Sequence, residues 1–127
     1  MADMLDTGSR WLSDLRRKHR TVPVVYGRGA DLVEVPATIG RSNFTEVNAF
    51  GVLEQVVSRD YLVTASDLVL GGAPVTPNRG DVIVEEGQGL RHTHEVLAPN
   101  GKHHWRWSDS YHRTYRIHTK LVKTEVL

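Results

Sequence analysis

The segment between residues 59 and 83 constrains the fold of this chain more than any other. It opens with the strand-like run Arg59-Asp60-Tyr61-Leu62-Val63, breaks at Gly71-Gly72, and ends in Pro77-x-x-Gly80-Asp81-x-Ile83. Glycine and proline at these places favour a tight turn that leads into a new strand. The segment therefore predicts two strands joined by a loop, and nothing in it resembles a catalytic motif.

Strand signals recur along the rest of the chain. Runs rich in Val, Leu, Ile and aromatic residues alternate with turn sequences roughly every 8–12 residues, a spacing typical of β-sandwiches and small barrels. We predict strands over residues 22–26, 32–39, 51–64, 81–86, 90–98, 103–107 and 111–123, with residues 43–49 irregular or briefly extended and a turn at Pro99-Asn100-Gly101. The fold class is therefore mainly β, a small antiparallel β-barrel or sandwich with long loops.

An amphipathic α-helix is predicted over residues 3–20, before the first strand. Apolar residues recur there at helical spacing, and basic residues that include Arg16 and Arg17 gather near its end, ahead of Pro23. The basic cluster complements the helix dipole, and the alternative is contact with nucleic-acid phosphate. A length of 127 residues favours a single domain over residues 1–127, made of this helix and a β-domain over 22–123.

Composition excludes several classes of protein. The chain has no cysteine, which excludes disulfides and thiolate metal sites, and no apolar run long enough to span a membrane or to serve as a signal peptide. Its net charge of +1 is unevenly spread, with +3 over residues 1–30, −6 over 31–98 and +4 over 99–127. Such segregation suits self-association or docking onto charged partners, and the alternative is an ordinary solvated surface.

The pair His92 and His94 is the one candidate metal site. Residues two apart on a strand share a face, so both imidazoles could reach one ion, as in a small metal-dependent β-barrel enzyme. Glu95 points to the opposite face and is not an obvious third ligand. We favour a solvent-facing or interface pair, and we predict no metal, no cofactor and no enzymatic activity, because no nucleophile or phosphate-binding motif is present.

Alternation over residues 111–123 predicts a last strand with two unlike faces. The apolar set is assigned to the core and consists of Tyr111, Tyr115, Ile117 and Leu121, while the basic and polar set consists of His112, Thr114, Arg116, His118 and Lys120. The basic face would line a DNA passage, meet a partner subunit or lie in solvent, and we favour the partner subunit. Trp105 and Trp107 share one strand face and are predicted to be core residues or inter-subunit anchors.

Two further features have a structural explanation. Arg79-Gly80-Asp81 matches the integrin-binding tripeptide, but a turn that requires glycine explains it fully. The carboxylates of Asp60, Asp67 and Asp81 are scattered along the sequence, and no pattern pairs them for catalysis.

These motifs together resemble the small head–tail connector proteins of tailed bacteriophages, in particular the head-closure or stopper group. The resemblance covers most of residues 22–122 and rests on Arg59–Val63, Asp67-Leu68, Pro77-x-x-Gly80-Asp81-x-Ile83, Glu95-Val96, Trp105–Asp109 and Arg116–Lys120. The N-terminal helix is more like that of an adaptor that docks on the portal, and a tail terminator ring would have similar size and β content.

The resemblance implies a structural virion protein without catalytic residues. It implies a ring of this chain, commonly six or twelve copies, that joins the portal or adaptor to the tail tube or terminator around the genomic DNA. The expected location is the head–tail interface of the virion, after assembly in the host cytoplasm and without contact to a membrane. Candidate inter-subunit or channel contacts are Gly71, Gly72, Pro74, Thr76, Asn78, Arg79, Arg16, Arg17, Arg116, His118 and Lys120. A nucleic-acid-binding module that uses residues 16–20 and the last strand remains the third alternative.

Overall fold

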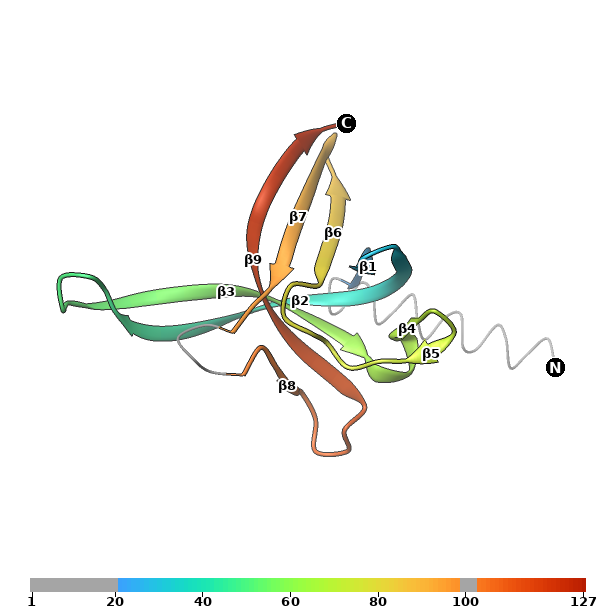
Figure 1. The fold of residues 1–127 in the computed structure, drawn as a ribbon, viewed down its shortest axis with the longest axis horizontal. Coiled ribbons are helices and arrows are strands. Elements are labelled where there is room, and N and C mark those ends of the chain that lie inside the picture. Colours follow the sequence, from blue (N-terminus) through green and yellow to red (C-terminus); the bar gives the residue numbers. More distant parts are fainter. Residues whose placement is uncertain (1–20, 99–102) are drawn as a thin grey trace.

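Strands dominate the fold. The computed structural model describes residues 21–98 and 103–127 (Figure 1). The strands are β1 (Thr21–Arg28), β2 (Asp31–Val47), β3 (Leu53–Thr64), β4 (Val69–Leu70), β5 (Ala73–Pro74), β6 (Val82–Gly87), β7 (Leu90–Val96), β8 (Trp105–Trp107) and β9 (Thr114–Val126). A short 3₁₀ turn, Ala65–Asp67, follows β3. All of these strands pair antiparallel, which confirms the prediction of a mainly antiparallel β protein.

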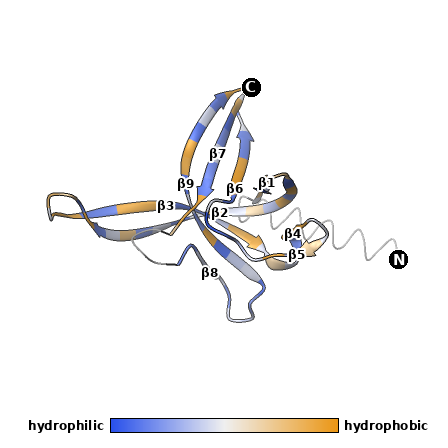
Figure 2. Ribbon diagram, viewed as in Figure 1, coloured by the Kyte–Doolittle hydropathy of each residue, from blue (hydrophilic) through white to orange (hydrophobic). Residues whose placement is uncertain are grey.

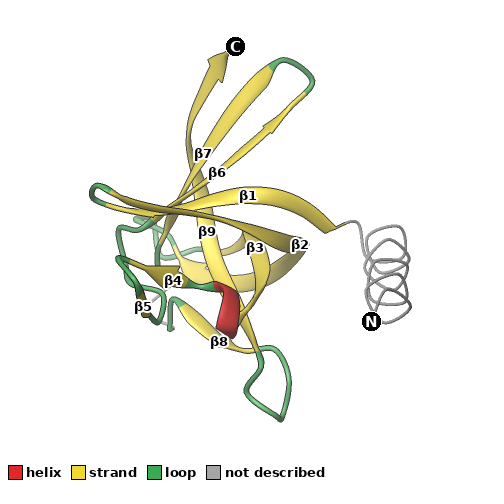
Figure 3. Ribbon diagram, turned by 90° about the vertical axis from the view of Figure 1, so that its right-hand side faces the viewer, coloured by secondary structure: helices red, strands yellow, loops and turns green. Residues whose placement is uncertain are grey.

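The main sheet returns on itself. Its strand order is β3-β2-β1-β6-β7-β9-β8, and β3 also pairs with β9. Six strands are therefore hydrogen-bonded in a closed circuit, and β8 is added at the outer side of β9. β4 and β5 form a separate two-stranded hairpin, which lies near the 3₁₀ turn in Figure 3.

Alternate residues of the strands supply the core, as the two-residue period of a strand requires. Tyr26, Tyr61 and Ile117 are completely buried, and Leu68 closes the core from the loop after β3. The wholly or almost wholly buried apolar residues are Val24, Tyr26, Val35, Ala37, Tyr61, Val63, Leu68, Leu70, Ile83, Val96, Tyr115 and Ile117. Because they come from every long strand, the core fixes the centre of the sheet, from which the strand ends project.

Two arms extend from this centre (Figure 1). β2 and β3 stay paired beyond the core, from Ala37–Val63 out to Val47–Leu53, and form a long hairpin arm. β6, β7 and the end of β9 form the second arm. β3 and β9 pair only between Arg59–Thr119 and Thr64–Thr114 and then diverge. Within the described residues, each arm therefore has a strand edge without a hydrogen-bonded neighbour.

Three sequence predictions about strand boundaries and burial are wrong. Residues 43–49 were expected to be irregular or only briefly extended, but the long strand β2 continues through Val47 because β3 pairs with it residue by residue. Tyr111 was assigned to the core, yet its side chain is 78% exposed, since His112 has a φ of 56° and the chain turns there before β9 begins. Leu121 is 49% exposed because it lies on the arm beyond the core.

Of the two roles predicted for Trp105 and Trp107, the structure confirms packing against the core. Trp105 and Trp107 are half-buried against the core, and both contact the ring of Tyr115 with centroids 4.8 Å apart. Arg106, which lies between them, points to the opposite side and is exposed.

Several predictions fall on residues outside the described ranges. These are the helix over residues 3–20 with Arg16 and Arg17, and the turn at Pro99-Asn100-Gly101. Among the described residues, no helix has the length and apolar character needed to cross a membrane.

Candidate functional site

Asp60 is the centre of a buried polar network between β2, β3 and β9. Its side chain is completely buried. Arg116 Nε donates to Oδ2 at 2.7 Å, His118 Nδ1 lies 2.9 Å from Oδ1, and the hydroxyls of Ser42 and Ser58 donate to the same carboxylate. Burial alone would raise the pKa of Asp60, but the hydrogen bonds from these four groups outweigh it and hold the pKa at about 2. The carboxylate therefore stays charged and holds the three strands together.

This network corrects the predicted role of the last strand. His118 was assigned to an exposed basic face, but it is buried because Asp60 attracts its ring inward from the opposite strand. Arg116 lies on the same face, and its side chain is only 20% exposed. Gly40 makes room for it, since a Cβ there would lie 3.1 Å from Arg116 Nη2. Of the predicted basic face, Lys120 is the exposed member on the strand beyond these two.

Asp81 is the second buried carboxylate, and it fixes the corner before β6. Tyr26 donates its hydroxyl hydrogen to Oδ2, Arg28 donates from Nε to Oδ1 at 3.0 Å and from Nη2 to Oδ2 at 2.9 Å, and the Asn78 backbone N–H donates to Oδ2 at 2.9 Å. Burial would raise the pKa of Asp81, but these donors, Arg28 foremost, lower it. The carboxylate of the Arg79-Gly80-Asp81 triplet is thus fully engaged in hydrogen bonds within the protein, as expected for a structural corner.

Asp81→Ala is expected to lower the free energy of unfolding by about 2 kcal/mol, because it leaves the completely buried Tyr26 hydroxyl without its acceptor. Loss of the ion pair between Arg28 and Asp81 contributes less to this change, because the Arg28 side chain is 32% exposed and solvent screens the pair. Urea unfolding measures the change. Arg79→Ala, in the same triplet but exposed, is the matched control and should stay within about 0.5 kcal/mol of wild type. Equal effects of the two substitutions would contradict the internal role of Asp81.

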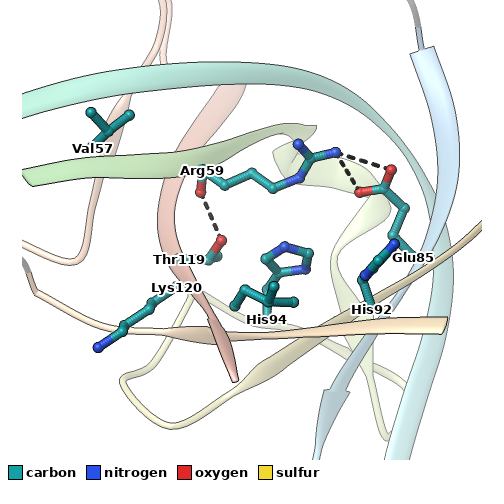
Figure 4. A pocket seen from close by; sticks show the side chains of 8 residues that line it. Val57, Arg59, Glu85, His92, His94, Thr119 and Lys120 are labelled. Carbon is teal, nitrogen blue, oxygen red and sulfur yellow. Dashed lines mark hydrogen bonds and ion pairs between the residues drawn. The ribbon is translucent and has the colours of Figure 1, made fainter. Parts of the chain in front are cut away.

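A hollow of about 460 Å³ lies where the two arms diverge, and its lining includes both histidines of the predicted pair (Figure 4). Arg59 Nη2 donates to both carboxylate oxygens of Glu85, at 2.8 and 3.0 Å, and the Tyr61 hydroxyl donates to Glu85 Oε1 at 2.8 Å. His94 Nδ1 lies 3.0 Å from the Tyr61 hydroxyl oxygen. These contacts join β3, β6 and β7 at the place where the two arms diverge.

The two histidines have different surroundings. His94 is buried in this network, whereas His92 is half-exposed and its Nδ1 lies 3.2 Å from the Thr124 hydroxyl. Within residues 21–98 and 103–127, no three His, Cys, Asp or Glu side chains come close enough together to hold a metal ion. Every fully buried side-chain nitrogen or oxygen of those residues has a hydrogen-bond partner, so the networks are internally satisfied.

His94 gives the protein a pH dependence near neutrality. Burial, together with the positive charge of Arg59, lowers the pKa of His94 from 6.5 to about 4. Between these values the unfolded chain takes up a proton that the folded protein does not, so stability falls as pH falls from about 6.5 to about 4, by about 3 kcal/mol. Urea unfolding across this range measures the slope. His94→Gln should flatten it and His92→Gln should not; an unchanged slope in His94→Gln would contradict the assignment.

The predicted loop contacts lie in and beyond the β4–β5 hairpin. Gly71 and Gly72 form its turn with φ of 59° and 82°, and Pro74 ends β5. Arg28 Nη2 donates to the carbonyl oxygen of Thr76 at 2.8 Å. The side chains that remain on the surface of this region are those of Pro74, Thr76, Asn78 and Arg79.

The tip of the β2–β3 arm exposes a group of apolar side chains, and sequence reasoning missed it. Phe50 is 90% exposed, and Val47, Val52 and Leu53 are 64%, 58% and 70% exposed. Figure 2 shows hydrophobic colouring at this tip, far from the core. The signal was present in the sequence, because apolar residues flank Gly51, but these residues were assigned to the start of the strand predicted over residues 51–64. An isolated protein gains nothing from apolar side chains held at the end of an arm, so the tip has the character of a contact surface.

Comparison of the sequence with known protein families distinguishes between the functions that the sequence left open. The model of the family described as phage head-tail joining protein matches residues 2–126. The chain belongs to this family. As a head-tail joining protein it is a structural connector of the phage virion, which confirms the resemblance found in the sequence. No match was found among curated proteins or among solved structures.

Proposed function

We propose that this head-tail joining protein forms a ring of identical copies that joins the portal to the tail around the DNA channel. The family supports the connector role, and the single observation that carries the proposal is the apolar tip of the β2–β3 arm. A projecting hairpin that holds Phe50 and Leu53 in solvent is suited to burial against another subunit.

The open strand edges support the same proposal. Long exposed strand edges favour pairing with other chains unless they are covered, and within the described residues each arm has such edges. The edge of β3 lies on the first arm and the edge of β9, near Lys120, lies on the second. Two different surfaces that point in different directions are what a head-to-tail contact requires, and such contacts close into rings when the rotation between copies allows it.

We propose that the remaining predicted contact residues meet the neighbouring proteins of the head–tail junction or the DNA that passes through it. We propose that the exposed loop of Pro74, Thr76, Asn78 and Arg79 meets the portal or the tail side. The exposed cation Lys120 and the partly exposed Arg116 are proposed to face an acidic partner surface or the passing DNA. Assembly of the ring would take place in the host cytoplasm before the virion is complete.

Mixing the purified protein with portal rings of the same phage tests the proposal. Mass photometry and negative-stain images should show portal particles that gain a whole ring of this chain. A monomer in isolation is compatible with the proposal, because the portal can act as the template for the ring. Absence of any association under all assembly conditions would contradict it, and binding to free tail ends instead of portals would identify a tail terminator ring.

A further inference from the structure

A basic groove runs beside the base of the β2–β3 arm. It has a volume of about 520 Å³ and lies between residues 41–44 of β2 on one side and His103, Trp105 and Arg106 on the other, with Arg116 and His118 also lining it. The groove is separate from the hollow between the two arms, with which it shares no lining residue.

Positive charge in this groove is not balanced. Arg106 lies directly opposite Arg116 across the β8–β9 pairing, and Arg116 Nη2 donates to the Arg41 carbonyl oxygen at 2.9 Å. Arg116 is neutralised by Asp60. Arg41 contributes its backbone here, because its side chain alternates to the face opposite Gly40 and Ser42, which contact Arg116 and Asp60. Arg106 is exposed and has no carboxylate partner within the described residues, so the groove is suited to an incoming anionic group.

The groove also has an aromatic wall. Phe44 packs edge-on against the His118 ring with centroids 5.2 Å apart, and both residues line the groove. Phe44 is only half-buried, so part of its ring faces the groove. The ligand that fits is a segment in which carboxylates flank an apolar side chain.

The tip of the β2–β3 arm has this chemistry. Glu46 and Glu54 lie directly opposite each other across the hairpin, and neither has an ion-pair partner among the described residues. Phe50, 90% exposed, lies in the turn between them. The tip cannot reach the groove of its own molecule, because Arg41 and Val47 belong to one extended strand and lie on the order of 20 Å apart. The occupant must therefore come from another molecule.

We propose that the β2–β3 tip of one copy binds in the basic groove of the next copy. Glu46 and Glu54 pair with Arg106 of the neighbour, and Phe50 packs on its aromatic wall. Tip and groove are different surfaces, so the contact repeats from copy to copy and closes as a ring. The inference rests on the proposed ring. DNA phosphate would satisfy Arg106, but it would leave the carboxylates and the apolar tip without partners.

Disulfide cross-linking tests the contact directly, because the natural chain has no cysteine. We expect virions that carry Phe50→Cys together with His103→Cys to give a ladder of linked multimers under oxidising conditions. Each single variant should give none, and neither should the control pair Phe50→Cys with Leu32→Cys, since Leu32 is also exposed, at 67%, but lies at the β1–β2 turn. Dimers from Phe50→Cys alone would show a tip-to-tip contact and overturn the proposal, as would joined virions without a ladder.

Charge reversal provides the second test. Glu46→Lys with Glu54→Lys, and Arg106→Glu, should each lower the yield of joined particles by about 100-fold, and the chain that carries all three changes should regain most of it. If the groove substitution, made in the chain with both cysteines, leaves the ladder intact and instead lowers the affinity for DNA, the groove binds DNA and the proposal is wrong. If the wild-type protein never enters the virion, the proposed function itself fails; joined virions of the double-cysteine variant without the ladder overturn only this contact.

Discussion

Asp60→Asn lowers the free energy of unfolding by about 4 kcal/mol. The substitution keeps the shape of the side chain but removes a completely buried charge, and it leaves Arg116 without its counter-ion and the buried His118 without its carboxylate hydrogen-bond partner. It also weakens the acceptor for the hydroxyls of Ser42 and Ser58. Urea unfolding at pH 7 measures the loss.

The matched control is Asp31→Asn, the same chemical change at an exposed position at the start of β2, and it should stay within about 0.5 kcal/mol of wild type. The pH dependence supplies a second check. Because the pKa of Asp60 is lowered from 3.8 to about 2 in the folded protein, its contribution is complete above about pH 4 and is lost as the pH falls to about 2. The loss attributable to Asp60 is about 2 kcal/mol, and Asp60→Asn should lack it. An Asp60→Asn protein as stable as wild type would contradict the network.

The sequence predicted the hairpins well, because their turns have a local cause. Gly87-Gln88-Gly89 separates the strands predicted over residues 81–86 and 90–98, and Gln88 and Gly89 there have φ of 53° and 75°. This left-handed backbone is what a tight hairpin turn needs, and it is encoded by adjacent residues. The Gly80-Asp81 corner was predicted for the same reason, and Gly80 has a φ of 88°.

The sequence could not show which distant residues meet. Asp60 and Arg116 are 56 positions apart, and Tyr26 and Asp81 are 55 apart, so no local spacing relates them. The same limit explains the error at His118, which looks like a surface residue from its polar neighbours on the strand. The length of β2 was missed because its outer half, around Asn43 and Thr45, is held by pairing with β3 and not by apolar alternation.

Replacing the apolar tip, with Phe50→Ser and Leu53→Ser together, is expected to lower the titre of infectious phage strongly without unfolding the protein. Both side chains are exposed, 90% and 70%, so the free energy of unfolding should change by less than about 0.5 kcal/mol for each. If they are anchors of a subunit contact, each contributes about 2 kcal/mol or more to binding, which is a factor of about 30. The titre of infectious phage should therefore fall by about two orders of magnitude or more.

Leu32→Ser is the control for this experiment. Leu32 is 67% exposed, like the residues of the tip, but it lies next to the β1–β2 turn, on another part of the molecule. Its replacement should leave the titre near that of wild type. A tip variant that is fully infectious would show that the exposed apolar residues take no part in assembly.

Particles from a phage in which this gene carries an early stop codon test the connector role most directly. Electron microscopy of the lysate should show DNA-filled heads and separate tails that are not joined. Addition of the purified protein should restore joined virions, and reconstruction of their necks should place a ring of this chain between portal and tail. Normally joined, infectious particles that lack the protein would contradict the account.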